Sequence, residues 1–253
     1  MTVFLSMLAL VVGGVLGGGA TYLVLHLLHV SAPLPPALVV GGFTALYGTS
    51  AFGFEVYKLG FFSLLGFVLD VTWSIVTTVF GLIWLVICLI TGSPFVTPDD
   101  LSKRSGTFVY QDSPRGQGYV MTVGNVIAGG WSSHEETHVW QARIFGPPYL
   151  PIYLTNLVIN LIFRWVSFDF SNYADEAYRR VCFEDWAYLA GTHPGSDIHW
   201  GFWVVGFILA SLYTALLVLI VVGIVTHKLV LILVGTIGLL VYTIIRTFLP
   251  HAE

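Results

Sequence analysis

Long apolar stretches make up most of the chain, and one polar stretch interrupts them. The stretches that are almost free of charged side chains are residues 3–30, 38–54, 59–90, 202–225 and 229–249. A helix needs about 20 mostly apolar residues to cross the hydrocarbon core of a bilayer. The pattern therefore predicts an all-α membrane protein with about five transmembrane helices.

Glycines are concentrated in the first apolar stretch. Gly13, Gly14, Gly17 and Gly18 form two overlapping GxxxG pairs. Glycines four residues apart leave a smooth helix face, which lets a second helix approach closely. We expect this face to pack against another helix, and an oligomer could form through it.

The pattern divides the chain into three parts. Residues 1–92 are expected to form N-terminal transmembrane helices, and residues 201–253 a C-terminal transmembrane hairpin. Residues 93–200 hold most of the charged side chains, so we expect them to carry the function. Most Lys and Arg residues are expected on the same side of the membrane as this region, whereas Lys58 and Lys228 are expected on the opposite side. Because Lys and Arg are enriched on the cytoplasmic side of membrane proteins, the middle region is predicted to face the cytoplasm.

One apolar segment, residues 149–166, lies inside the polar region. Asn156, Asn160 and Arg164 recur in it at four-residue spacing and give it a polar stripe. A helix with such a stripe can lie in the membrane interface. We therefore predict an interfacial helix here, with a full span as the alternative.

The composition supports a membrane protein. Of 253 residues, 56% are hydrophobic and 9% are charged, whereas a soluble domain carries about 25% charged residues. The formal net charge is −4 and there is no run of basic residues, which argues against nucleic-acid binding. Two cysteines are too few for a disulfide framework or a thiolate metal site.

The polar region contains an HExxH motif, formed by His134, Glu135 and His138. Residues four apart lie on the same face of a helix, so both imidazoles can reach one metal ion. Glu135 is then the candidate catalytic base, which takes a proton from a water molecule that the metal activates.

The residues around the motif predict a hairpin followed by a helix. Residues 107–110 and 119–123 flank a turn rich in Gly, Pro and Asp, which is typical of a β-hairpin. Ser132 and Ser133 are good N-cap residues for a helix that contains the motif. The Gly-Pro-Pro sequence at residues 146–148 is expected to end that helix.

A strand, an HExxH helix and a downstream helix with a Glu ligand resemble the gluzincin-type zinc metalloproteases. Because the motif lies among several spans, the chain is distantly similar to the HtpX-type and CAAX-prenyl-protease-type membrane enzymes. Residues 134–141, HEETHVWQ, also look like the HExxHxxQ helices of many bacterial metallopeptidase-like proteins. The resemblance implies an interfacial zincin-like region, zinc as cofactor and hydrolysis of peptide bonds.

A tetrahedral zinc site with two histidines needs a further protein ligand. Glu184 is the first candidate, because Glu184 and Ala187 match the Glu-x-x-Ala sequence of gluzincin-type enzymes. Glu176 is the alternative: with Arg180 and Glu184 it is spaced i, i+4, i+8, so one Glu could bind metal while the other pairs with Arg180. The two membrane families often have an acidic residue four positions after the ligand. Here those positions hold Tyr188 or Arg180.

Further polar residues are candidates for supporting roles. Asp70 lies inside an apolar stretch, where a charge is costly, and could accept a hydrogen bond from a ligand imidazole. Asn125, just before the motif helix, could position the substrate backbone, and Arg180 could hold a carboxylate. His193 or His199 could stabilise an oxyanion.

These observations lead to one main hypothesis, a zinc-dependent endopeptidase of the cell membrane. We expect it to cut membrane-associated or unfolded polypeptides. Its partner is then the lipid bilayer that surrounds it, and its catalytic region is expected to face the cytoplasm. The alternative is a non-hydrolytic membrane protein with a structural or sensing zinc site. A diiron oxidase is less favoured, because such sites use two Glu-x-x-His motifs and this chain has one.

Overall fold

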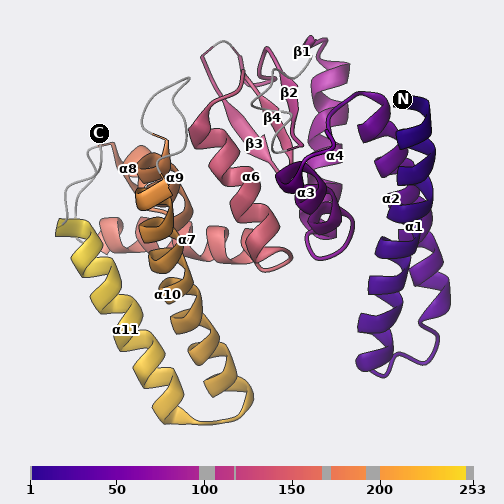
Figure 1. Ribbon diagram of the computed structural model, residues 1–253. Helices are drawn as coiled ribbons and strands as arrows, with labels where there is room; N and C mark the ends of the chain where they lie inside the picture. Colours follow the sequence, from indigo (N-terminus) through magenta and orange to yellow (C-terminus); the bar gives the residue numbers. More distant parts are fainter. Residues whose placement is uncertain (1, 97–105, 117, 167–171, 192–199, 249–253) are drawn as a thin grey trace. The chain divides into compact units, whose positions relative to one another are not determined.

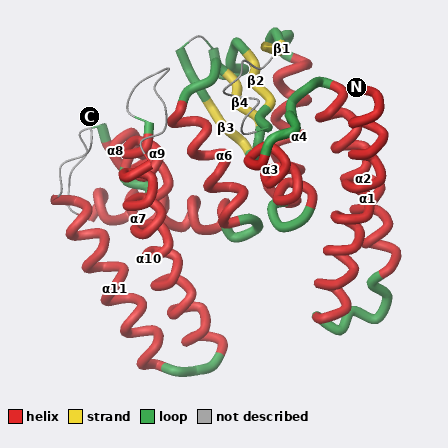
Figure 2. The backbone as a smooth tube through the Cα atoms, in the orientation of Figure 1, coloured by secondary structure: helices red, strands yellow, loops and turns green. Residues whose placement is uncertain are grey.

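The computed structural model describes residues 2–96, 106–116, 118–166, 172–191 and 200–248. These residues are mainly helical, with one small sheet (Figures 1 and 2). The chain forms two compact units, which we call the N-terminal unit (residues 1–131 and 138–149) and the C-terminal unit (residues 132–137 and 150–253). The motif helix α6 (Ser133–Phe145) therefore contributes residues to both units.

The N-terminal unit begins with a helical hairpin of α1 (Thr2–Leu27) and α2 (Leu34–Gly53). Gly13 and Gly17 let the two helices approach closely, because a Cβ atom at either position would overlap Thr44 of α2. The Thr44 hydroxyl donates a hydrogen bond to the carbonyl oxygen of Gly13 at 2.8 Å. The glycine face thus packs within the chain, as expected of a helix-packing surface. An oligomer stays a prediction, but these glycines already have their partner helix.

The third apolar stretch forms two helices instead of one. α3 (Phe61–Val71) and α4 (Ile75–Ile90) are bent by 95° relative to each other. Side chains at the break compete with the helix for backbone groups: the Ser74 hydroxyl donates to the carbonyl oxygen of Leu69 at 2.8 Å. The expected continuous span at residues 59–90 is therefore interrupted.

A four-stranded sheet follows, with the strand order β1-β2-β4-β3. Its strands are β1 (Phe95–Val96), β2 (Phe108–Tyr110), β3 (Met121–Val123) and β4 (Val126–Ala128). β2 runs parallel to β4, and β3 runs antiparallel to β4. In the chain, β4 is followed after a short connection by α6 (Figure 1).

The predicted hairpin of residues 107–110 and 119–123 is wrong in its pairing. The hairpin joins β3 to β4 through Gly124 and Asn125, and β4 separates β2 from β3. Gly124 has φ +58° and a Cβ there would overlap the backbone of Thr77, so the tight turn favours glycine. Val126, Ile127 and Ala128 are fully buried, which places β4 in the middle of the sheet.

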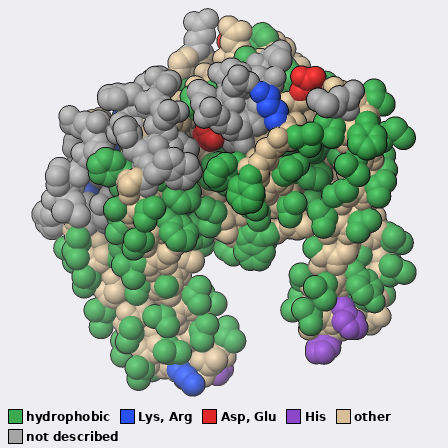
Figure 3. Space-filling model, viewed as in Figure 1, with side chains coloured by type: hydrophobic (Ala, Val, Ile, Leu, Met, Phe, Trp, Pro, Cys, Tyr) green, Lys and Arg blue, Asp and Glu red, His purple; other side chains and the backbone are tan. Residues whose placement is uncertain are grey.

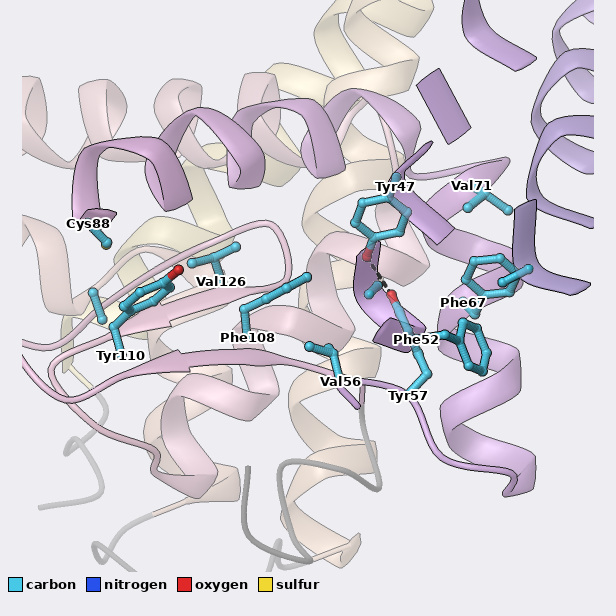
Figure 4. Close-up of a cluster of buried hydrophobic side chains, with 13 residues drawn as sticks. Tyr47, Phe52, Val56, Tyr57, Phe67, Val71, Cys88, Phe108, Tyr110 and Val126 are labelled. Carbon is cyan, nitrogen blue, oxygen red and sulfur yellow. Dashed lines mark hydrogen bonds between the residues drawn. The ribbon is translucent and has the colours of Figure 1, made fainter. Parts of the chain in front are cut away.

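An aromatic core joins these elements in the N-terminal unit. Figure 4 shows aromatic side chains of α2, α3, β2 and the segment after α2 in one buried cluster. Phe52 and Phe67 pack edge to face with ring centroids 5.3 Å apart, and Tyr57 contacts both rings. Aromatic pairs of this kind add to the stabilisation from burial alone. The core therefore connects the helices of the apolar N-terminal part to the sheet.

The C-terminal unit is helical. Its helices after α6 are α7 (Tyr149–Val166), α8 (Tyr173–Arg179), α9 (Cys182–Ala190), α10 (Trp200–Val225) and α11 (Leu229–Phe248). α9 packs on α10 through Trp186, whose ring lies where a Cβ atom of Gly206 would be. Trp186 also packs edge to face on Trp203 at 4.9 Å. α9 is thereby held against the long apolar helix α10.

The polar side chains of α7 are buried inside the protein. Asn156, Asn160 and Arg164 are 1%, 5% and 8% exposed. The Asn156 side-chain oxygen accepts a hydrogen bond from the backbone N–H of Cys182 at 2.6 Å, which satisfies a donor of the first turn of α9. The Asn160 amide donates to the carbonyl oxygen of Ala177. The stripe thus binds α8 and α9, and the interfacial location of residues 149–166 stays a prediction.

Three described helices are long and apolar enough to cross a membrane: Thr2–Leu27, Tyr149–Val166 and Gly201–Val225. The bent pair α3 and α4 raises this number to four if it forms one broken span. In α11, the part whose side chains are described, Leu229–Ile245, is a shorter apolar helix. The visible faces of the two helical hairpins are covered by apolar side chains (Figure 3). The chain is thus a helical membrane protein with a small sheet, and three or four helices qualify as spans where the sequence predicts about five.

The packing of α1 on α2 predicts that one glycine substitution in α1 is destabilising and that a second one is not. Gly17→Ala should lower the unfolding midpoint in detergent, because the new methyl group overlaps Thr44, and overpacking costs about 1–3 kcal/mol. Gly19→Ala is the matched control, since no atom lies within 4 Å of its Cβ position. Equal midpoints for the two variants would contradict this packing.

Candidate metal centre

The first turn of α6 is fixed by a serine cap. Ser132 precedes the helix, and its hydroxyl oxygen accepts a hydrogen bond from the backbone N–H of Glu135 at 3.2 Å. The carbonyl oxygen of Ser132 accepts from the backbone N–H of Glu136. This cap satisfies backbone donors that a helix start leaves without partners. The helix predicted around the motif is therefore confirmed.

His134, His138 and Glu184 form a group that could hold a metal ion. One ligand atom from each residue lies within 4.8 Å of the other two. The Nε2 atom of His134 is 3.5 Å from Oε2 of Glu184. Two ligand atoms bound tetrahedrally to zinc at about 2.0–2.1 Å would be about 3.3–3.4 Å apart. The donor set could therefore hold a metal ion, and the spacing of His134 and Glu184 is close to that of two zinc ligands.

Glu184 reaches His134 because α9 approaches the start of α6 closely. The C-cap of α9 is Gly191, and a Cβ atom there would lie 2.5 Å from the backbone nitrogen of His134 and 2.7 Å from Ser133. Only a residue without a side chain allows this approach. The Glu184 side chain is also held from α7, since the Tyr153 hydroxyl donates to its Oε1 at 2.6 Å. Oε2 is thereby left facing His134.

The ring of His138 is oriented by Gln141, one turn further along α6. Nδ1 of His138 lies 2.8 Å from Oε1 of Gln141, and both side chains are buried. A carbonyl oxygen can only accept, so Nδ1 carries the proton and donates it. Nε2 then keeps its lone pair, which is the state in which an imidazole binds a metal.

Two tyrosines lie in the electrostatic field of the site. Burial raises the pKa of Tyr178, and the charge of Glu184, its hydrogen bond and the charge of Glu135 raise it further. The pKa of Tyr188 is raised by burial and then by Glu184. The ring of Tyr188 packs on His134 with centroids 4.5 Å apart. Both phenols therefore stay protonated at neutral pH and can donate hydrogen bonds.

The structure separates the two candidates for the third ligand. Glu184 joins the histidines, whereas Glu176 lies 3.6 Å from Arg164 and 3.7 Å from Arg180. The i, i+4 pair of Glu176 with Arg180 is thus present, as the spacing predicts. Arg180 holds a carboxylate, but that carboxylate is not part of the metal group.

The other predicted supporting residues lie elsewhere. Asn125 is buried in the N-terminal unit, where its amide donates to the Tyr47 hydroxyl. Asp70 pairs with Arg143 of α6 rather than with an imidazole. His193 and His199 lie outside the described residues.

Three contributions to the site were not assigned from the sequence. Gln141 had a signal, since its position at i+3 from His138 belongs to the HExxHxxQ pattern. No sequence pattern identifies Tyr153 or Gly191. Tyr153 contacts Glu184, and Gly191 contacts His134, only because of how α7 and α9 pack.

The close approach of α9 predicts that Gly191→Ala weakens metal binding. The added methyl group overlaps the first turn of α6, and moving α9 away to relieve this overlap withdraws Glu184. Zinc content after dialysis should fall below that of the wild type. Gly201→Ala, with no atom within 4 Å of its Cβ position, should keep the wild-type content. Identical zinc content in both variants would argue against this role of Gly191.

The hydrogen bond to His138 predicts that Gln141→Leu lowers the affinity for zinc. Loss of such an outer partner typically costs about 10- to 100-fold in affinity. Competition with a chromogenic chelator measures this directly. Gln111→Leu introduces the same change at an exposed position and should leave the affinity unchanged. A wild-type affinity in Gln141→Leu would show that His138 does not depend on this bond.

No protein-family model, curated protein or solved structure matches this chain.

Proposed function

We propose that the protein is a membrane-embedded, zinc-dependent endopeptidase. The observation that carries the proposal is the group of His134, His138 and Glu184, with Glu135 directly beside the first histidine. Two imidazoles and one carboxylate are a donor set typical of hydrolytic zinc sites. The resemblance of the motif to gluzincin-type enzymes points to the same chemistry.

In this proposal each residue has a defined task. A bound zinc ion supplies Lewis-acid chemistry and brings the pKa of a water molecule to about 7. Glu135 takes the proton of the attacking water and later gives it to the leaving amine. Tyr153 holds Glu184, and Gln141 holds His138. Tyr178 and Tyr188 remain protonated donors at the edge of the site.

Three ligands are the number that hydrolytic zinc sites use, and the described residues supply three. Structural zinc sites are closed by four protein ligands, whereas catalytic sites use three and leave one position for water or substrate. The metal group among the described residues has three members. A structural or sensing role is the alternative, and it would need a fourth protein ligand.

The substrate we propose is a membrane-associated or unfolded polypeptide. β3 lies at one edge of the sheet and, among the described strands, pairs only with β4. An extended peptide could add to this edge through backbone hydrogen bonds. The spans would keep the protein in the cell membrane, and residues 93–200 hold seven of the ten Lys and Arg residues, which supports a cytoplasmic location of the site.

The proposal predicts that Glu135→Gln abolishes hydrolysis while zinc remains bound. Loss of a general base lowers the rate by about 10²- to 10⁴-fold, because no other group takes the proton at that position. Detergent-purified protein is analysed for zinc and then incubated with fluorescently labelled unfolded casein. Glu136→Gln is the matched control, since it removes the neighbouring carboxylate of the same helix, and it should retain activity.

The possible results separate the two functions. Zinc in all three proteins with cleavage by the wild type and Glu136→Gln supports the endopeptidase. Zinc in all three without cleavage by any of them favours the structural or sensing role. Absence of metal from the wild type would refute both.

A further inference from the structure

The C-terminal end of α6 is bound to the break between α3 and α4. Arg143 of α6 makes two hydrogen bonds to the carboxylate of Asp70, from Nε to Oδ1 at 3.0 Å and from Nη2 to Oδ2 at 2.7 Å. The side chains are 1% and 2% exposed. Beside this pair, the indole N–H of Trp73 donates to the carbonyl oxygen of Ile144 at 2.9 Å. Two consecutive residues of α6 are thus attached to the break.

Neutral groups complete the hydrogen bonds of this ion pair. The Tyr57 hydroxyl donates to Oδ2 of Asp70 at 2.6 Å, and Arg143 also donates to the carbonyl oxygen of Gly106 at 2.9 Å. Tyr57 is hydrogen-bonded in turn to Tyr47, as Figure 4 shows. Burial lowers the pKa of Arg143, but the charge and hydrogen bonds of Asp70 raise it by more, so it stays above its ordinary value. Tyr57 and the backbone of Gly106 thus add hydrogen bonds to both members of the ion pair.

Stability alone does not account for a buried ion pair of this kind. Removing two charges from water costs several kcal/mol for each ion, and apolar side chains of similar volume are often equally stabilising. An ion pair with two parallel hydrogen bonds differs from an apolar contact in its strong directionality. Arg143 can satisfy both oxygens of Asp70 only over a narrow range of helix orientations.

The orientation of α6 about its axis determines where its histidines point. Arg143 follows His138 by five residues, which is about 500°, or 140° around the helix. The ion pair and the metal ligands therefore occupy well-separated sides of α6. At about 5 Å from the axis, a rotation of about 10° moves a side-chain tip by about 0.9 Å. Metal–ligand distances tolerate only about 0.2 Å.

We propose that Asp70 and Arg143 are positioning residues of the candidate metal centre. By fixing the rotation of α6, their ion pair sets the direction in which His134 and His138 point together, and so whether Glu184 can complete the group with them. This inference rests on the proposed function, because it takes these histidines as metal ligands. It assigns to the break between α3 and α4 a role in the metal chemistry of a helix more than 60 residues further along the chain.

The test compares three variants of the full-length protein in detergent. Asp70→Asn removes the charge, and Arg143→Lys keeps a positive charge but loses the two parallel hydrogen bonds. Thr44→Val is the control, because Thr44 is buried in the same unit and its hydroxyl bonds to α1 instead of α6. Zinc affinity is measured by chelator competition, the ligand geometry by the visible absorption of the Co²⁺-substituted protein, and stability by the unfolding midpoint.

We expect Asp70→Asn and Arg143→Lys to bind zinc about 10- to 100-fold more weakly than the wild type, the loss typical of an outer partner. Their Co²⁺ spectra should also change. Thr44→Val should lower the midpoint and leave both metal readouts unchanged. If Asp70→Asn does not fold, Arg143→Lys decides the outcome.

Two negative results are distinguishable. Wild-type zinc affinity and Co²⁺ spectra in a destabilised Arg143→Lys protein would show that the pair only stabilises the fold, which overturns the inference and leaves the proposed function intact. A wild-type protein that binds neither zinc nor Co²⁺ would overturn the proposed function and, with it, this role of the pair.

Discussion

A buried charge has to be compensated within the protein, because an apolar interior solvates an ion poorly. This constraint acts on a chain with only 9% charged residues and organises both units. In the N-terminal unit it joins Asp70 to Arg143 and ties α3 to α6. In the C-terminal unit the buried carboxylate of Glu184 accepts a hydrogen bond from Tyr153 and lies beside His134. The helix that carries the motif is thus attached at both ends through polar side chains.

The motif could be predicted because its geometry is local. His134 and His138 share a helix face wherever the helix lies, and a serine cap is recognisable from the residues beside it. The third ligand could not be decided from the sequence, since Glu176 and Glu184 both follow at plausible spacing. Tertiary packing distinguishes the two glutamates. Gly191 lets α9, which carries Glu184, approach the first turn of α6, whereas Glu176 lies close to Arg164 of α7.

The errors in the predicted fold have the same origin. The turn-rich sequence after residue 110 predicts that the two strands on either side of it pair with each other. In the structure, β4 lies between these strands, and its three residues are completely buried. The third apolar stretch has the hydropathy of one helix, yet hydroxyl groups at the break bind backbone carbonyls and interrupt it. The polar stripe of α7 was correctly located, but its partners are α8 and α9 rather than water. Periodicity shows that a face is polar and leaves open what the face contacts.

The hydrogen bond between Tyr153 and Glu184 has a consequence for coordination chemistry. A carboxylate can bind an ion through one oxygen or chelate it through two. In Glu184, Oε1 accepts the hydrogen bond from the tyrosine hydroxyl, and Oε2 is the oxygen that lies 3.5 Å from Nε2 of His134. If Glu184 bound an ion through one oxygen only, a four-coordinate ion held with the two imidazoles would keep one position for water or another ligand. A phenol 31 residues away in the chain would thereby influence how the carboxylate binds an ion.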